Sequence, residues 1–447
     1  MTIPTIGDVP AYPDVPSYAN VTGGLHIWEG DGWKDESMSW KTGVYVASNL
    51  SGPTELVFRG PEAQELLSRL SINNVHKWRI GTSKHLVMPD ENGFIANHGL
   101  AIRDGEETFR QLASLPWAIY KNAALNLDVE IEVRNVFILQ VAGPKSLQVL
   151  ERLIGEELRS VEFLGIQNVS VPGIPASVDV EVSRIGMAGT LAYELRGPFE
   201  HGAAAFDAVY QAGKEFGIKR LGWRTYVVNH TEGGFPQMAC NFLPSAIAAP
   251  GFLGDATSPD FTWAANTPLR VSGSIDPNDL RARLRTPHEV NWGWMAKYDH
   301  EFIGRAAIEA EAANPVRKTV TLRWNNEDVL DVFASQFQQG EEYRNIEFPC
   351  AVQSPAGGHA DLVTKDGKSI GVASAGAYSY FYRELISHAV IDLDQTEIGN
   401  EVVVHWGDFG KRIKQVRATV QRFPYLDLPS NKDYNLAQIP SGLAKKP

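Results

Sequence analysis

The sequence predicts a protein of the α+β class, in which two related α+β halves precede an all-β sandwich or barrel. The first observation is a strand–turn–helix pattern that occurs twice before residue 160. The second is a change from Thr319 onward, where short alternating strands are separated by glycine, aspartate and proline. The third is the length of 447 residues, which at roughly 150 residues per domain indicates two to three domains.

The first copy of the pattern is ELVFRGPEAQELLSRL, which ends at Leu70, and the second is FILQVAGPKSLQVLERL, which ends at Leu153. In each copy a strand is followed by a Gly-Pro pair and then by apolar residues at helical spacing. Pro61 and Pro144 are expected at a helix start, where the missing N–H costs nothing. Because strand, break and helix recur in the same phase, the two halves are expected to be related.

Two further segments complete the expected organisation. Residues 198–216 predict a helix with Phe206, Val209 and Tyr210 on one face. Residues 236–298 are rich in proline, glycine, tryptophan and phenylalanine and have little periodicity. A connection of this length inside a compact protein is usually functional, so we expect it to contribute to a site.

Composition narrows the classes of partner. The net charge of −12 argues against nucleic acid or an anionic membrane as the main partner. Cys240 and Cys350 do not form a C-x-x-C motif, which argues against a disulfide framework or a structural zinc site and favours a reducing cytoplasm. No run of 18 apolar residues occurs. The sequence therefore predicts a soluble cytoplasmic protein, and it does not indicate the oligomeric state.

Several common motifs are missing. The fingerprint G-x-G-x-x-G does not follow any expected strand, and DGKS at Asp366 has Leu362 where the first glycine of a phosphate loop belongs. There is no H-E-x-x-H motif. Nucleotide and metal chemistry are therefore not expected.

Five motifs in a fixed order carry a resemblance. They are GMAG at residues 186–189 with Glu194, GWRTYVVNHTEGGFP at 222–236, DHEFIGRAAIE at 299–309, KTVTLRWN at 318–325, and YSY at 378–380 followed by IDL and VVVHWG. Over roughly Trp40 to Asp408 the chain resembles the aminomethyltransferase (glycine-cleavage T-protein) superfamily. Within it, the chain looks most like the bacterial tetrahydrofolate-dependent aryl O-demethylases of the vanillate type.

The resemblance implies a three-lobed disc with a folate in a central funnel. The expected lobes are an N-terminal α+β lobe at residues 1–137, a second α+β lobe at 138–315 with the folate-site strand and the long insertion, and a β-barrel-like domain with a tail at 316–447.

The resemblance also implies a pterin site. Its members use the carboxylate at the Glu194 position to accept hydrogen bonds from the pterin N–H groups, because a planar edge with two donors calls for a bidentate acceptor. The neighbouring segment Met187, Ala188 and Gly189 is expected to contact the cofactor, with glycines allowing close approach. An exposed glutamate on an edge strand is the alternative. Arg224 and Tyr226 are the remaining cofactor candidates.

A departure from the family falls at the reacting site. Family members have acidic side chains where this chain has Asn97 and His98. An imidazole, with an unperturbed pKa of about 6.5, can donate or accept a proton near neutral pH, so His98 and Asn97 are the expected catalytic residues. The alternative is that Asn-His-Gly forms a turn.

Aromatic residues and a second histidine are the candidates for substrate contact. His85 is expected before a strand, either lining the funnel or on the surface. The expected walls of an aromatic pocket are Trp28, Trp117, Tyr120 and Phe235, each of which could instead be core. The cluster of Trp292, Trp294 and Tyr298 is expected at a lid edge or between lobes.

The sequence is compatible with three functions. The first is tetrahydrofolate-dependent O-demethylation of a lignin-type methoxylated aromatic. The second is a folate-independent lyase that releases formaldehyde from a phenolic lignin-derived dimer, with His98 as base. It is prompted by the lack of a histidine in SNLSGPTE at residues 48–55 and by the poor alignment, near Ser114, of an arginine that the resemblance places beside the substrate. The third is a non-catalytic folate- or aromatic-acid-binding protein.

Overall fold

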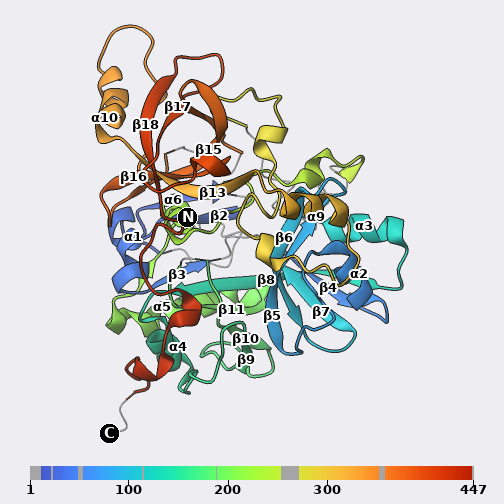
Figure 1. Ribbon diagram of the computed structural model, residues 1–447. Helices are drawn as coiled ribbons and strands as arrows, with labels where there is room; N and C mark the ends of the chain where they lie inside the picture. Colours follow the sequence, from blue (N-terminus) through green and yellow to red (C-terminus); the bar gives the residue numbers. More distant parts are fainter. Residues whose placement is uncertain are drawn as a thin grey trace.

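The computed structural model of the chain describes residues 12–21, 24–48, 54–112, 115–187, 189–252, 271–351 and 358–444. Its strands form a two-stranded sheet, a ten-stranded sheet and a closed barrel (Figure 1). Among the described helices, none has the length and apolar character needed to span a bilayer.

One part of the large sheet has the order β5-β6-β7-β4-β8. Its strands are β4 (Thr54–Arg59), β5 (Thr82–Pro89), β6 (Ile95–Arg103), β7 (Thr108–Leu112) and β8 (Glu130–Ala142). The helices of this region are α2 (Ala63–Leu70), α3 (Trp117–Leu125) and, from later in the chain, α9 (Arg305–Ala313). Figure 1 shows all three helices beside these strands, where their apolar faces and the sheet form one core.

The other part of the sheet continues β8-β11-β10-β9. Its strands are β9 (Ile166–Val169), β10 (Val180–Ser183) and β11 (Ala192–Pro198), with β3 (Tyr45–Ser48) beside β8 and β12 (Lys219–Arg220) beside β3. The remaining elements of this region are β1 (Ser17–Val21), β2 (Gly24–Glu29), α1 (Trp33–Thr42), α4 (Ser146–Ile154), α5 (Gly202–Gly213) and α6 (Trp223–Gly233). The expected helix at 198–216 is present as α5 with a 3₁₀ turn at each end.

The strand β8 belongs to both parts. Its residues Glu130–Asn135 pair with β4, and Val136–Ala142 pair with β11. The lobe boundary expected at residues 137 and 138 falls inside this strand. The two parts are therefore joined by one continuous backbone rather than by a linker.

The duplicated pattern forms the expected units, β4–α2 and the end of β8–α4. Each helix begins two residues after its proline, because Gly60 and Gly143 accept the first turn's hydrogen bonds from Ala63 and Ser146. Both glycines have positive φ, 132° and 126°. A Cβ would lie 2.6 Å from a backbone oxygen at Gly60 and 2.4 Å at Gly143, so both copies need glycine for the same reason.

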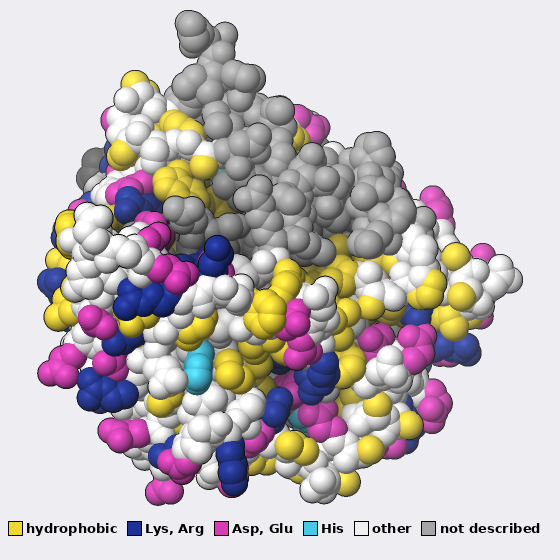
Figure 2. All heavy atoms as spheres, turned by 90° about the horizontal axis from the view of Figure 1, so that it is seen from above, with side chains coloured by type: hydrophobic (Ala, Val, Ile, Leu, Met, Phe, Trp, Pro, Cys, Tyr) yellow, Lys and Arg dark blue, Asp and Glu magenta, His cyan; other side chains and the backbone are white. Residues whose placement is uncertain are grey.

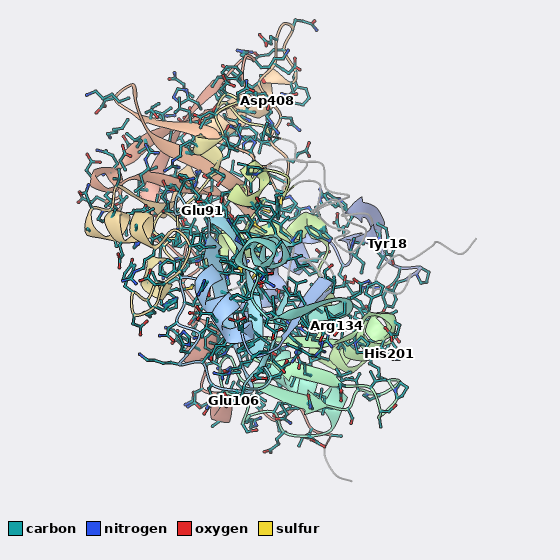
Figure 3. All side chains as sticks on the ribbon, turned by 90° about the vertical axis from the view of Figure 1, so that its right-hand side faces the viewer. Tyr18, Glu91, Glu106, Arg134, His201 and Asp408 are labelled. Carbon is teal, nitrogen blue, oxygen red and sulfur yellow. The ribbon has the colours of Figure 1, made fainter. Side chains whose placement is uncertain are left out.

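The C-terminal region is a closed barrel in the order β13-β16-β15-β14-β17-β18, which decides the expectation between sandwich and barrel. Its strands are β13 (Arg317–Trp324), β14 (Asp361–Lys365), β15 (Lys368–Ser379), β16 (Glu384–Asp392), β17 (Glu401–Trp406) and β18 (Lys414–Gln421), and α10 (Asn326–Ser335) packs against β18. Figure 3 places Asp408, just after β17, at the opposite end of the molecule from Glu106 between β6 and β7.

Candidate active site

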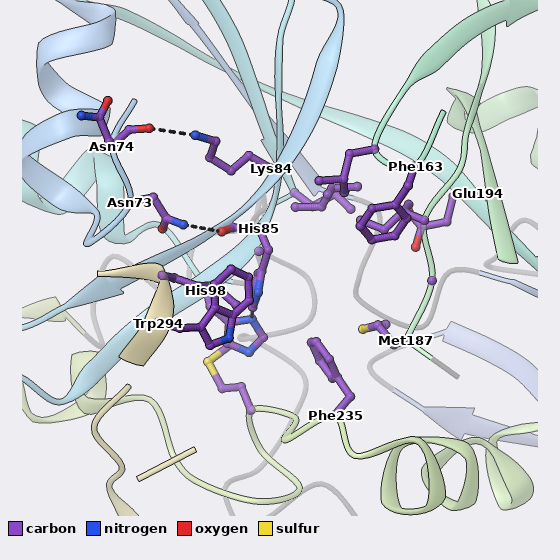
Figure 4. Close-up of a pocket in the computed structure, with 18 of the residues that line it drawn as sticks. Asn73, Asn74, Lys84, His85, His98, Phe163, Met187, Glu194, Phe235 and Trp294 are labelled. Carbon is purple, nitrogen blue, oxygen red and sulfur yellow. Dashed lines mark hydrogen bonds between the residues drawn. The ribbon is translucent and has the colours of Figure 1, made fainter. Parts of the chain in front are cut away.

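A cavity of about 720 Å³ lies where the two parts of the large sheet meet. Strands β5 and β6 supply one wall and β11 supplies the opposite wall, as the labelled side chains in Figure 4 show. The turn after α6, at residues 235–238, and the segment at 294–299 also contribute to the lining, together with residues of the segments 73–77, 163–164 and 185–187. The long aromatic-rich connection therefore contributes to a site, as its length predicts.

Glu194 lies in the wall formed by β11. This strand lies between β8 and β10, with Glu194 opposite Gln140 of β8, so the edge-strand alternative is wrong. Within the described part of the chain, Glu194 Oε2 is buried and has no hydrogen-bond partner. Burial raises the pKa of the Glu194 carboxyl to about 7, although the Arg196 guanidinium opposes this in part. A buried acceptor without a donor fits a ligand that brings N–H groups, as a pterin does.

The segment before β11 lies beside this carboxylate. Gly186 and Met187 line the cavity, whereas Ala188 lies outside the described residues. A Cβ on Gly186 would lie 2.2 Å from the Cβ of Ala192, and one on Gly189 would lie 2.9 Å from Cα of Gly233. These glycines are therefore required by contacts within the protein, whatever ligand is bound.

His98 and His85 form a hydrogen-bonded pair in the facing wall. His85 Nε2 lies 3.0 Å from His98 Nδ1, and the rings are nearly perpendicular. His85 pairs with Leu100 across the β5–β6 ladder, so the two histidines are diagonal neighbours on one face. The alternative that Asn-His-Gly forms a turn is wrong, since both residues lie inside β6. The expectation that His85 precedes a strand is also wrong, since it lies inside β5.

The histidine pair, His85 and His98, is enclosed by aromatic rings. Trp292 lies 4.8 Å and 4.9 Å from the two imidazole centroids, and Phe235 lies 5.8 Å and 6.2 Å from them. Burial lowers the pKa of His85 to about 4, and burial followed by the charge of His85 lowers the pKa of His98 well below 6.5. The expectation that His98 titrates near neutral pH is therefore wrong: both rings are neutral there.

In the described structure His98 Nε2 is buried without a hydrogen-bond partner, while Nδ1 is engaged by His85. One ring must donate to the other across this contact, and whichever does so decides whether Nε2 of His98 carries a proton. The pair can therefore present either a donor or an acceptor to the cavity without becoming charged.

Six of the expected and described site residues do not line the cavity, and one of them is Gly189. Asn97 points to the opposite face of β6 from His98 and is buried. Trp117 stacks on Tyr120 in the core beside α3, and the Tyr120 hydroxyl donates to the Pro250 carbonyl.

The other two residues, Arg224 and Tyr226, lie on α6. Arg224 pairs with Glu29 and donates to the Phe348 carbonyl. Tyr226 is fully buried against the ring of His230. Trp28 and Tyr298, offered as wall and lid residues, are also absent from the lining, whereas Trp294 lines it and is 72% exposed.

Other lining residues were not expected from the sequence. They include Lys84, Phe163, Gln237, Met238 and Lys297. Each lies in a loop or next to a named candidate, and only the strand register and the fold bring them together. The one sequence signal that could have identified Lys84 is its position directly before the candidate His85 in TSKHLVMP.

Comparison with known proteins identifies the family of the chain. Residues 18–244 match the GCVT N-terminal domain. The sesamin methylene transferase of Sinomonas sp. strain No.22 is 33% identical over 421 residues, covering 92% of each chain. The chain belongs to the GCVT family. The syringate O-demethylase of Sphingobium sp. strain SYK-6 is 29% identical, covering 84% of this chain and 82% of the relative.

The GCVT fold is also shown by a solved structure. The glycine cleavage system aminomethyltransferase T from Bartonella henselae superposes with a TM-score of 0.67 at 15% identity, covering 93% of this chain and 96% of that chain. The expected aminomethyltransferase resemblance and T-protein-like fold are thereby confirmed.

Acidic and basic side chains are mixed over the described part of the face in Figure 2, without a broad field of one sign.

Proposed function

We propose that this GCVT-family protein is a one-carbon transferase that demethylates a methoxylated aromatic compound and passes the carbon to tetrahydrofolate. The observation that carries the proposal is one cavity with an unpartnered carboxylate, Glu194, in one wall and an unpartnered imidazole nitrogen, His98 Nε2, in the other. The named activities of the sesamin and syringate relatives support the same class of reaction.

Glu194 is the residue that would hold the cofactor. Its carboxylate would accept hydrogen bonds from the pterin edge, and these bonds would favour the ionised form that burial disfavours. Met187 and Gly186 lie beside it in the lining. Tetrahydrofolate, when bound, supplies the nucleophilic nitrogen that receives the one-carbon group.

The aromatic substrate would lie against the histidine-pair wall. Phe235 and Met238 line the cavity there, and Trp292 packs behind both imidazoles. Flat apolar walls bind a ring and exclude water, which strengthens the electrostatic interactions within the site. The protein thereby aligns the ether carbon with its acceptor.

The histidine pair would manage the proton. When the oxygen–carbon bond breaks, its electron pair stays on the aryl oxygen, which then needs a proton. His98 donates its Nε2 proton to that oxygen while its Nδ1 takes the Nε2 proton of His85 across the 3.0 Å contact. In the same step His85 would take a proton at Nδ1 from solvent, and the proton that the acceptor nitrogen of tetrahydrofolate loses on gaining the carbon would be released to solvent. Neither ring has to become an imidazolium in a site that disfavours one.

We expect the substrate to be a small lignin-type methoxylated phenol or phenolic acid, acted on in the cytoplasm, where Cys240 and Cys350 remain free thiols.

The experiment is a product assay with tetrahydrofolate and a panel of sesamin, syringate and vanillate. Formation of 5-methyl-tetrahydrofolate from a methoxylated compound, lost in Glu194→Gln, supports the proposal. Formaldehyde released without added folate would instead establish the lyase. Binding of folate or aromatic acid without any turnover would establish the non-catalytic alternative.

A further inference from the structure

Two ammonium groups in the cavity lining lack a carboxylate partner. Lys84 Nζ donates to the Asn74 carbonyl oxygen at 2.8 Å, and Lys297 Nζ donates to the Trp294 carbonyl oxygen at 2.9 Å. Among the described residues, neither takes part in an ion pair. Figure 4 shows Lys84 reaching toward Asn74 on the side of the cavity opposite Glu194 and Met187.

A third lysine nearby behaves differently. Lys77 Nζ lies 3.0 Å from Asp299 Oδ2, and Asn74 Nδ2 donates to both oxygens of the same carboxylate. The charge of Lys77 is thus balanced locally, whereas those of Lys84 and Lys297 are not. All five residues line the cavity, so this part of the lining keeps an excess of two positive charges.

The two unbalanced charges also act on one another. Burial, and then the charge of Lys297, lower the pKa of Lys84. Lys84 is half-buried and Lys297 is exposed. Two like charges on one cavity lining repel each other, and an anion bound beside them offsets that repulsion. A carboxylate suits two ammonium groups, because its two oxygens can each accept a charge-assisted hydrogen bond.

We propose that Lys84 and Lys297 form a carboxylate-binding subsite of the cavity. The identity of the ligand rests on the proposed function, and it offers two sources of carboxylate: the glutamate end of the reduced folate, or the acid group of an aromatic substrate. The subsite selects for ligands whose carboxylate lies at the end remote from Glu194, the residue proposed to bind the pterin.

The test measures affinity by calorimetry for two pairs of probes, each pair differing in the carboxylate. Tetrahydrofolate is compared with its diamide, in which both glutamate carboxylates are replaced by neutral amides, and vanillate is compared with vanillin, which has an aldehyde in place of the carboxylate. The variants are Lys84→Met and Lys297→Met, which keep the apolar stem. Loss of one charge-assisted hydrogen bond is expected to weaken binding of the carboxylate probe by about tenfold, and to leave its partner probe unchanged.

The matched control is the double variant Lys77→Met/Asp299→Asn, which removes an ion pair from the same lining without changing its net charge. We expect it to change every affinity by less than about twofold, as for exposed pairs. The pair of probes that responds identifies the source of the carboxylate.

Equal weakening of both members of each pair, no weakening of either carboxylate probe, or no binding of any carboxylate by the wild type would overturn the subsite. A charge-dependent loss of vanillate or tetrahydrofolate binding in a protein that forms no 5-methyl-tetrahydrofolate would uphold the subsite and refute the proposed function. The two failures are therefore distinguishable.

Discussion

Two glutamates of the large sheet are buried in opposite ways. Glu55 on β4 is fully buried and contacts three arginines: Arg196 at 2.9 Å, Arg134 at 2.6 Å and Arg110 at 3.7 Å. Glu194 on β11 leaves one oxygen buried without a partner. The difference arises because Arg196, which lies on the same strand as Glu194, forms its ion pair with Glu55 instead.

The comparison separates a structural carboxylate from one kept for a ligand. The Glu55 cluster, comprising Glu55, Glu181, Arg110, Arg134 and Arg196, ties β4, β7, β8, β10 and β11 together with closed ion pairs. The cavity holds groups whose hydrogen-bonding capacity is incomplete: Glu194 and His98. Buried polar groups are normally satisfied, so unsatisfied ones that line a cavity indicate where a ligand completes the hydrogen bonding.

The largest expected effect is on catalysis, and it tests the role of the unpartnered groups in the cavity. His98→Ala should lower kcat by about 10²–10⁴-fold, the usual contribution of a general acid or base, with little change in substrate affinity. Steady-state kinetics on the methoxylated substrate measures it, and Asn97→Ala on the opposite face of β6 is the matched control. Retention of more than about half of the wild-type activity in His98→Ala would show that the proton comes from elsewhere.

The next effect is on folding, through the Glu55 cluster. Glu55→Ala removes the partner of three arginines, and breaking a buried ion pair from one side costs about 3–5 kcal/mol of unfolding free energy. Urea denaturation followed by circular dichroism measures it. A loss of less than about 1 kcal/mol, the usual range of exposed pairs, would erase the distinction between the two glutamates.

A smaller effect concerns cofactor binding. Tetrahydrofolate at a hundredfold excess over its Kd should stabilise the wild type by about 2.7 kcal/mol, seen as a rise in Tm. Glu194→Gln should lose most of this rise because it loses an acceptor oxygen, while its own Tm without ligand stays at or above that of the wild type. A full ligand-induced rise in Glu194→Gln would mean that another group holds the pterin.

The smallest effect is the pH dependence of the ligand-free protein. The folded-state pKa of Glu194 is raised to about 7, so the folded state binds more protons than the unfolded state between the ordinary carboxyl range and pH 7. The Glu194 contribution to stability therefore falls as pH rises through that window. The fall is about 2 kcal/mol, because the Glu194 side chain as a whole is partly exposed and solvent reduces the effect of the raised pKa.

The depressed pKa values of His85 and His98 act in the opposite direction, since the unfolded state then binds the extra protons. The measurement is therefore the difference in unfolding free energy between the wild type and Glu194→Gln at pH 5 and pH 7. Parallel pH curves for the two proteins would contradict the raised pKa.

Much of the fold could be predicted because it is written in local patterns. The Gly-Pro break and the following helical spacing at residues 60–70 and 143–153 specify two equivalent units, and alternation after Thr319 specifies the barrel strands. Glu194 was identifiable because a carboxylate among apolar strand residues is unusual. Each of these signals is contained within about a dozen residues of sequence.

The site itself depended on register and packing. Whether Trp117 and Tyr120 face a cavity or a core is decided by α3 and the segment near Pro250, which are distant in sequence. The pairing of His85 with His98 follows from the β5–β6 ladder, and the depressed pKa values follow from rings contributed by residues 235 and 292. Lys297 joins Lys84 only because the chain returns after more than 200 residues, a separation read directly from the sequence.

The shared strand β8 has a consequence for how molecules enter and leave. Domains joined by a flexible linker can swing apart to exchange a ligand, but here the cavity walls are hydrogen-bonded through one unbroken strand. Moving the two walls apart would break several backbone hydrogen bonds between β8 and its neighbouring strands, which costs free energy. We therefore expect substrate and product to enter and leave through the rim of the cavity beside Trp294. The rates of ligand exchange should then depend on the size and charge of the side chains at that rim. The spacing between the two cavity walls should stay constant throughout turnover.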